Sequence, residues 1–446
     1  MKRASLVLAG LLVPALLQAQ LADPSTRALG MAGAYTSLAR GYEAVYWNPA
    51  MLAVTGRPGL SIGLPHVNVE VGSNAFGFSD FRKYANSYLT TADKQTILDK
   101  MANDSSLTIR ALGGVAPFGL SVGPFAFAVG SSFEGDLAVG KDAVQLALFG
   151  NASRTGAGQF FTARGSGGFG WGATTAAASF ALPFSLPVGR LSVGITGKYT
   201  IGHFLASAGD LGTKIGANPS FSAVTAGQAI YTNYGSHCGS FTPMGTDACG
   251  GQAGKGVSAD LGAALQLGGG LTLSAVAVNA LGSMTWDDSR LVYERTRRQV
   301  TQDASGSVTT VVTDSTRLTT AAAIEADPQA RAMKDSLLAH ASFAKLVRVG
   351  FGLRSGMLTL GAAMQLRLEQ GLDQQPSQMV AAGAEYRLLG ILPLRVGASW
   401  DFGEATTLSA GTGVQFLGIN IDASVANISG SVHPGVRLGL GVGLIW

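Results

Sequence analysis

The residues of this chain that could do chemistry are few and widely spaced. Cys238 and Cys249 lie in a stretch rich in glycine and serine, and His237 precedes the first of them. Two thiolates and one imidazole leave a tetrahedral zinc site one ligand short and lack its usual spacing. In an exported chain, two cysteines favour a disulfide that closes a small loop. We therefore expect a Cys238–Cys249 disulfide rather than a metal site.

A nucleophilic site would need a serine beside a histidine. His203 with Ser207, and Ser431 with His433, are the pairs that come close in sequence. A hydrolytic triad is defined by geometry that sequence spacing does not supply, so a loop or interfacial histidine is the favoured interpretation. The G-x-G-x-x-G pattern within 165–170 has no following helix, and with 62 glycines in the chain it arises by chance. The sequence predicts neither an enzyme nor a cofactor.

Charged residues occur instead at alternate positions of apolar segments. A strand points successive side chains to opposite faces. Segments with polar residues on one face and apolar residues on the other are typical of a wall with lipid outside and a wet interior. The charged residues expected to face that interior are Lys198, Asp260, Arg348, Arg367, Glu385, Arg387, Arg395, Asp401 and Asp422.

The last residues of the chain, 436–446, show this alternation most clearly. Arg437, three glycines and Ile445 fall on one face of the predicted strand. The other face is expected to contact lipid, with an aromatic ring at the periplasmic interface, and it consists of Val436, Leu438, Leu440, Val442, Leu444 and Trp446. We expect this strand to pair with 60–71, because an open edge in lipid leaves backbone groups unpaired.

The alternation predicts strands of a barrel wall. Their predicted number is even, as closure of an antiparallel barrel requires. Short connections (117–119, 183–189, 267–270, 354–356, 388–393 and near 417) alternate with long ones (72–105, 132–170, 203–254 and 283–345), as in outer-membrane barrels. The predicted fold is all-β, a 14-stranded antiparallel transmembrane β-barrel. Its strands are expected at 60–71, 106–116, 120–131, 171–183, 190–202, 255–267, 270–282, 346–354, 357–368, 379–388, 393–402, 406–416, 418–427 and 434–446.

Short helices are expected in the outer loops. The spacing of apolar residues predicts them within 79–102, 139–149 and 326–345. Thr91 or Asp93 is a candidate N-cap for the first, and Pro328 fits the first turn of the last. The polar stretch 287–320 is expected to be a mobile loop or an outer hairpin.

The N-terminus and the composition indicate export. A basic start, a short apolar run and Ala19 predict a signal peptide over 1–19. Charged residues make up only 13% of the chain and the net charge is +4, which does not favour nucleic-acid binding. Residues 20–56 are rich in small and aromatic residues and too short for a core of their own. We expect them to fill the lumen of a barrel formed by 57–446.

This N-terminal segment carries two motifs, ALGMAGA at 28–34 and WNPA at 47–50. They resemble the N-terminal signature of the FadL-type outer-membrane transporters, which include FadL and TodX. The same signature occurs in barrels of the PorV type and in uncharacterised FadL-like relatives. Ala32 departs from the pattern, because many members have glycine there. The matching residues are Gly30, Gly33, Trp47, Asn48, Pro49 and Ala50.

The resemblance implies an N-terminal hatch, or plug, inside the barrel, with Asn48 and Pro49 near the centre of the lumen. It implies uptake of hydrophobic small molecules, of the long-chain fatty acid or hydrocarbon class, by a hatch-gated route with lateral exit. The alternative is a PorV-like, secretion-associated or structural barrel that binds a protein partner. The expected location is the bacterial outer membrane. The expected partners are membrane lipid, the hydrophobic ligand and the barrel assembly machinery, which would read the C-terminal strand.

Overall fold

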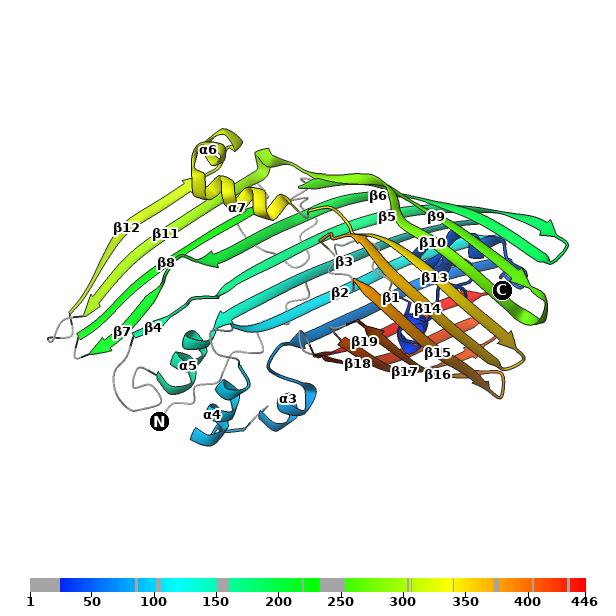
Figure 1. Ribbon diagram of the computed structural model, residues 1–446, viewed down its shortest axis with the longest axis horizontal. Helices are drawn as coiled ribbons and strands as arrows, with labels where there is room; N and C mark the ends of the chain where they lie inside the picture. Colours follow the sequence, from blue (N-terminus) through cyan, green and yellow to red (C-terminus); the bar gives the residue numbers. More distant parts are fainter. Residues whose placement is uncertain are drawn as a thin grey trace.

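The computed structural model describes residues 25–446 except 85–86, 102–105, 151–159, 219, 233–252, 303–304, 306, 340, 373–376, 403–404 and 431–433. In this part of the chain, fourteen antiparallel strands form a closed barrel (Figure 1). They are β1 (Leu60–Ser73), β2 (Ser106–Val122), β3 (Phe125–Gly140), β5 (Gly167–Leu186), β6 (Gly189–Asp210), β9 (Gly254–Leu267), β10 (Leu271–Trp286), β13 (Lys345–Ser355), β14 (Leu358–Glu369), β15 (Gln378–Leu388), β16 (Leu392–Asp401), β17 (Ala405–Phe416), β18 (Ile419–Gly430) and β19 (Gly435–Ile445).

Each predicted strand corresponds to one of these fourteen, and the predicted closure is confirmed. β19 pairs with β1, with Val436 opposite Val71 and Leu444 opposite Ile62. Leu438 and Leu440 are 56% and 65% exposed, whereas the glycines between and beside them are buried. The alternation of apolar and small residues therefore places the apolar face outside and the bare face inside.

One predicted turn is wrong. Residues 117–119 were expected to connect two strands, but they lie within β2, and the turn follows at Gly123–Pro124. Pro117 lies in a bulge of β2, where a missing N–H is tolerated. Gly123 has a φ of 57°, which glycine adopts without strain.

The predicted alternation of connection lengths is confirmed. The short turns lie at the end of the barrel where Trp446 pairs with Leu60, which we name the turn end. The opposite loop end carries α3 (Phe78–Tyr84), α4 (Thr91–Asp99), α5 (Lys141–Phe149), α6 (Ala321–Ala326) and α7 (Pro328–Leu338), on the left of Figure 1. Thr90, rather than Thr91 or Asp93, is the N-cap of α4, and Asp93 completes a capping box. Among the described residues, no helix is long and apolar enough to cross a membrane.

The sheet of the barrel continues outward at the loop end, and we name this extension the outer sheet. β8 (Ser220–Thr232) pairs with the outer part of β6, then with β11 (Leu291–Gln302), which pairs with β12 (Val308–Leu318). Two shorter strands, β4 (Phe160–Thr162) and β7 (Lys214–Asn218), extend it beside β8. The sequence predicted β11 and β12 only as one of two options for 287–320, and it missed β7 and β8.

An apolar cluster joins this outer sheet to α6 and α7. Ile324, Ala330 and Leu337 of the two helices are buried against wall residues that include Trp171 and Trp286. The indole N–H groups of Trp171 and Trp286 donate to the carbonyls of Leu372 and Ala341, at 3.1 and 2.7 Å. Helix α7 therefore belongs to a packed cover over one side of the mouth of the barrel.

Residues 25–54 lie inside the barrel, near the turn end (Figure 1, dark blue). They form α1 (Thr26–Gly30), the 3-10 helix η2 (Gly41–Glu43), α2 (Ala44–Trp47) and the 3-10 helix η3 (Pro49–Ala53). Nearly all of these residues are buried, and they contact strands on every side of the wall. We name them the lumen segment. They make the largest apolar core of the molecule together with inward alanines of β2, β3, β5 and β9.

Candidate functional site in the lumen

The first motif of the lumen segment folds as a capped helix followed by a tight turn. Ser25 accepts a hydrogen bond from the N–H of Ala28 and so caps α1. Ala32 and Gly33 then adopt φ values of 51° and 85°, which reverse the chain. The left-handed conformation suits glycine and is unfavourable for alanine by roughly 1–2 kcal/mol. Glycine at position 32 would therefore adopt this turn without strain.

The second motif, WNPA, contains the start of the 3-10 helix η3 and is hydrogen-bonded to the barrel wall. The side-chain oxygen of Asn48 accepts from the N–H of Ala50 at 3.0 Å, and Pro49 occupies the first helical position of η3. The Asn48 amide nitrogen donates to the carbonyls of Ala263 and Ala275, at 3.3 and 3.1 Å. One side chain therefore caps η3 and fixes it to β9 and β10.

Glycines of the wall form a belt that receives the lumen segment. Gly352, Gly361, Gly383 and Gly397 are consecutive register partners across β13 to β16. A methyl group added at Gly397 would lie 2.3 Å from the carbonyl carbon of Met31. Added methyls would clash in the same way at the glycines of the other three strands, and at Gly194, Gly262 and Gly439 elsewhere in the wall. The bare face of β19 is thus explained by close approach of the lumen segment.

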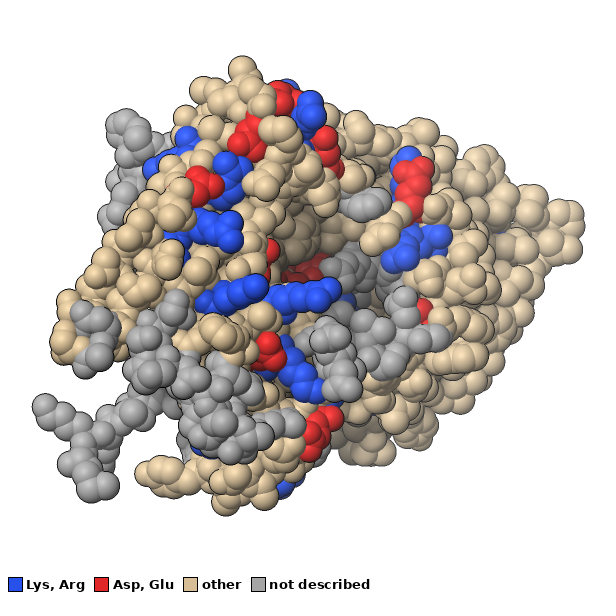
Figure 2. Space-filling model, turned by 60° about the vertical axis from the view of Figure 1, so that its left-hand side comes forward, with Lys and Arg blue, Asp and Glu red and all other residues tan. Residues whose placement is uncertain are grey.

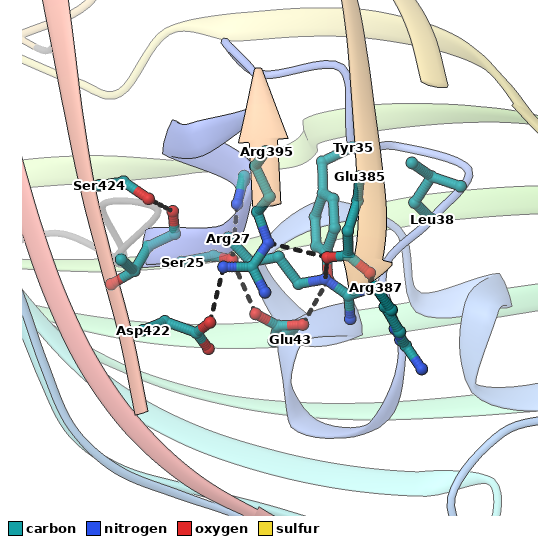
Figure 3. Close-up of polar contacts among 12 residues, drawn as sticks. Ser25, Arg27, Tyr35, Leu38, Glu43, Glu385, Arg387, Arg395, Asp422 and Ser424 are labelled. Carbon is teal, nitrogen blue, oxygen red and sulfur yellow. Dashed lines mark hydrogen bonds and ion pairs between the residues drawn. The ribbon is translucent and has the colours of Figure 1, made fainter. Parts of the chain in front are cut away.

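A buried ionic chain ties the lumen segment to β15, β16 and β18 (Figure 3). Arg27 donates two hydrogen bonds to the carboxylate of Glu385, both of 2.7 Å. Arg395 donates to the same carboxylate at 2.8 Å and to Asp422 at 2.6 Å. Arg27, Glu385 and Arg395 are nearly inaccessible to solvent. Bidentate guanidinium pairs of this kind are among the strongest hydrogen-bonded contacts in proteins.

Glu43 is a second charged group of the lumen segment, and its partners come from the segment itself. Its carboxylate accepts from the hydroxyl of Ser25 at 2.7 Å and from that of Tyr35 at 2.5 Å. The ring of Tyr35 packs edge-on against Trp47 and beneath the guanidinium of Arg27. These contacts hold the parts of the segment together independently of the wall.

A cavity of about 510 Å³ lies between the lumen segment and the loop end. The segment forms its floor with Leu29, Gly33, Tyr46 and Trp47. Its walls combine aromatic side chains, Phe133, Trp171 and Phe343, with many polar groups. The volume falls within the range of sites that enclose a small organic molecule.

The cavity is charged as well as aromatic, and Figure 2 shows basic and acidic side chains around the hollow at this end. Arg437 donates to Glu70 at 2.6 Å, and the guanidinium of Arg348 lies 5.0 Å from the ring centroid of Trp47. Five basic side chains and three acidic ones line it, a net charge of +2. They are Arg110, Lys198, Arg348, Arg367 and Arg437, with Glu70, Glu134 and Asp401.

Among the irregular places of the wall, one involves both β1 and β2. In β1, Leu64 and Pro65 are bulged opposite Val442 of β19. In β2, Ala116 and Pro117 are bulged opposite a single residue of β3. Between β1 and β2 the pairing stops at Gly63–Gly119 and resumes at His66–Ala116. Since proline has no N–H to donate, two adjacent strands lose ladder hydrogen bonds at the same height. We name this place the proline window.

Tyr42 of the lumen segment covers the inside of the proline window. Its ring fills the space that side chains at Gly63 and Gly119 would occupy. Its hydroxyl lies 2.9 Å from Nε2 of His66, and Nδ1 of His66 lies 2.6 Å from the carbonyl oxygen of Leu64. A carbonyl only accepts, so Nδ1 of His66 donates to Leu64, and Nε2 pairs with the Tyr42 hydroxyl.

At the loop end, Arg295 lies between two carboxylates. It donates to Asp314 at 2.7 Å and lies 3.3 Å from Asp327. Asp327 caps α7 by accepting from the N–H groups of Ala330 and Gln329. The hydrogen bond from Ala330, together with the charge of Arg295, lowers the pKa of the Asp327 carboxyl.

The structure places the sequence-predicted site residues in two groups. Gly33 and Trp47 line the cavity. Gly30, Asn48, Pro49 and Ala50 pack against the wall, so Asn48 and Pro49 lie beside β9 and β10 rather than near the centre of the lumen. Cys238, Cys249, Ser431, His433 and residues 1–24 lie outside the described residues.

Of the charged residues expected to face the lumen, Glu385 pairs with the Arg27 side chain of the lumen segment. Sequence reasoning missed Arg27 and Glu43. The available signal was their charge, because a charged residue in a segment that must be buried needs a partner. His203 contacts Thr174, at 3.0 Å from its hydroxyl.

These features define a closed antiparallel barrel that encloses an N-terminal segment and a cavity above it. Within that class, the chain belongs to the DUF5723 family, a family of unknown function, whose model matches residues 49–420. A comparison with curated protein sequences finds no match.

Among solved structures, the chain is similar to the TodX deltaS2S3 mutant monoaromatic hydrocarbon channel, at 10% identity and a TM-score of 0.48, over 94% of this chain and 97% of that one. It is similar to the CymD monoaromatic hydrocarbon channel, at 10% identity and a TM-score of 0.46, over 94% and 97%. It is also similar to a Pseudomonas aeruginosa FadL homologue, at 12% identity and a TM-score of 0.45, over 94% and 98%. The structural comparison therefore also finds the similarity to FadL-type channels that the motifs predicted. This similarity concerns the fold alone.

Proposed function

We propose that this protein is a bacterial outer-membrane barrel for the uptake of hydrophobic small molecules. The lumen segment, within the plug 20–56, closes the pore at rest, and the turn end faces the periplasm. The observation that carries the proposal is the fit of the lumen segment to the glycine belt, with a ligand-sized cavity directly above it. The exposed apolar side chains on the outside of the barrel support a position in lipid.

The charges of the cavity favour one ligand class over another. A plain hydrocarbon would place apolar surface against charged side chains such as Arg348 and Arg367 and gain little from the net charge of +2. A long-chain acid has a carboxylate for the basic side chains and a chain for Trp47, Phe133 and Phe343. We therefore place the ligand in the long-chain fatty acid class rather than among neutral hydrocarbons.

The proline window is the proposed exit into the membrane. The cavity reaches β1 at Asn68, close to His66, and Tyr42 covers the window from the inside. A shift of η2 that withdrew Tyr42 would join the two spaces. By leaving sideways, an apolar chain avoids the charged groups, such as Glu385, that hold the lumen segment further down the axis of the barrel.

Conductance tests the plug. A chain without 25–56 should form a steady pore in planar bilayers, whereas the parent should conduct only rarely. Since the deletion removes much of the inner core, the variant must first be shown to fold, by its resistance to denaturation in detergent. A folded deletion variant with the conductance of the parent would contradict the plug.

Lipid-vesicle transfer tests the ligand and the route. The protein is reconstituted, and transfer of a fluorescent long-chain acid and of its methyl ester into the bilayer is followed. We expect the acid to be favoured. Replacing both Pro65 and Pro117 by valine restores N–H groups to the window and should slow transfer of the acid. The matched control is Pro183→Val in β5, where pairing with Ser192 is continuous. Equal rates for all variants would rule out the window.

A partner-binding barrel remains the second candidate. The observation that favours it is the outer sheet, which stands beyond the barrel wall and forms no part of the cavity floor.

A further inference from the structure

We propose that the free edge of β12 is a docking site for an extended, acidic segment of another protein, which binds by adding a strand to the outer sheet. This goes beyond the uptake function and does not depend on it.

β12 is the last strand of the outer sheet. Its residues pair with β11 from Tyr293–Leu318 to Gln302–Val308, and among the described residues no other strand pairs with it. Figure 1 shows it at the outer border of the sheet, at the upper left. An edge strand presents a row of backbone N–H and C=O groups that another strand can use.

The composition of β12 does not protect this edge. Residues 308–313 read VTTVVT, with no charge, no proline and no glycine. Val308, Val311 and Val312 are 60%, 51% and 53% exposed. Edge strands are usually blunted by lysine, proline or a covering element. β-branched residues favour the extended conformation, so the composition of β12 suits pairing with an added strand.

The charge beside the edge selects the partner. Arg297 and Arg298 are exposed on β11, opposite Asp314 and Val312. Asp314 is bonded to Arg295, and the remaining charges of the two strands themselves, Glu294 and Arg317, pair with each other. The two adjacent arginines therefore give the hairpin a surplus of positive charge, which favours an acidic segment.

A second copy of this chain in the same membrane fits less well. Antiparallel self-pairing of β12 requires a twofold axis perpendicular to the sheet. β12 runs roughly along the barrel in Figure 1, so that axis would lie in the membrane plane and turn the second barrel upside down. The partner is therefore a separate polypeptide on the loop side.

Peptide binding tests the proposal on the full chain in detergent. The probe is a fluorescent, end-blocked peptide of about ten residues, the length of a typical strand, in which threonine or valine alternates with glutamate. One control peptide carries N-methyl groups at alternate amides, which removes strand pairing but keeps the charge. A second control has lysine in place of glutamate. Binding is followed by fluorescence anisotropy.

The protein variants are Val311→Pro and Val312→Pro. Successive N–H groups of a strand point to opposite edges, so one of the two prolines removes an N–H from the free edge. A double Arg297→Ala/Arg298→Ala variant removes the charge, with Arg331→Ala on exposed α7 as its control. Detergent resistance reports that each variant is folded.

We expect the acidic peptide to bind the parent and the Arg331→Ala variant, and to bind at least one proline variant and the double variant tenfold more weakly. Neither control peptide should bind. The proposal is overturned by absence of binding to the parent, by equal binding of the N-methylated peptide, or by parent-like binding of both proline variants. A parent dimer that both prolines abolish would assign the edge to a second copy and would also overturn it.

Discussion

The close backbone contact between the lumen segment and the wall at Gly397 yields a sharp prediction. A methyl group at this position would lie 2.3 Å from the carbonyl carbon of Met31 and 2.6 Å from the nitrogen of Ala32. Both are backbone atoms, so no side-chain rotation relieves the clash. Overpacking of this kind costs typically about 1–3 kcal/mol. Gly397→Ala should therefore destabilise the docked segment and raise its undocked fraction by roughly 5- to 150-fold.

The assay is open probability in planar bilayers, with Gly197→Ala as the matched control. A methyl group at Gly197 meets no atom within 4 Å. Alanine in place of glycine inside a strand otherwise stabilises it by roughly 0.5–1 kcal/mol. Gly397→Ala should therefore raise the open probability, whereas Gly197→Ala should leave the pore closed. Equal open probabilities in the two variants would refute the account of the glycine belt.

Four further predictions follow from other contacts. Glu385→Gln should cost about 3–5 kcal/mol in denaturant unfolding, because it leaves buried guanidinium groups uncompensated, whereas Glu369→Gln, at an exposed pair, should cost at most about 1 kcal/mol; equal losses would contradict the burial argument. Ala32→Gly should stabilise the protein by roughly 1–2 kcal/mol, and a loss of stability would show that the turn is not strained. Leu440→Arg should cost roughly 2–4 kcal/mol if the residue faces mid-membrane lipid, and parent-like detergent resistance would rule that out. The pKa of Asp327 is lowered in the folded protein, so its contribution is complete above about pH 4 and is lost as pH falls through the lower folded-state value; the protection of the α7 amides, taken relative to their intrinsic exchange rates at each pH, should fall over that interval, and unchanged protection would contradict the cap.

The barrel could be predicted because its signal is local and repeated. Alternation fixes which residues face outward, and the parity of connection lengths fixes which end carries the loops. The error at 117–119 arose because proline and glycine usually mark a turn, whereas here Pro117 belongs to a bulge that depends on β1 and β3. The strands β7 and β8 were missed because 203–254 was treated as a single outer loop.

The site could be predicted only in part, because it is made by contacts between distant residues. Motifs placed 28–34 and 47–50 in the lumen, but nothing in the sequence says that Asn48 binds the carbonyls of β9 and β10. The sequence shows that one face of β19 consists largely of glycine. The reason for these glycines becomes clear only in the structure, where the lumen segment lies against them. Arg27 could have been found by asking where a charged residue in a buried segment would find its partner.

One measurement tests the central claim that movement of the lumen segment controls passage through the barrel. The hydroxyl oxygens of Ser37 in the segment and Ser274 in β10 lie 2.8 Å apart, so cysteines at both positions are placed to form a disulfide. The lock is built in a chain whose Cys238 and Cys249 are replaced by serine. Transfer of the fluorescent long-chain acid should stop when the lock is oxidised and return to the parent rate on reduction. The same rate in the oxidised and reduced states would contradict the claim.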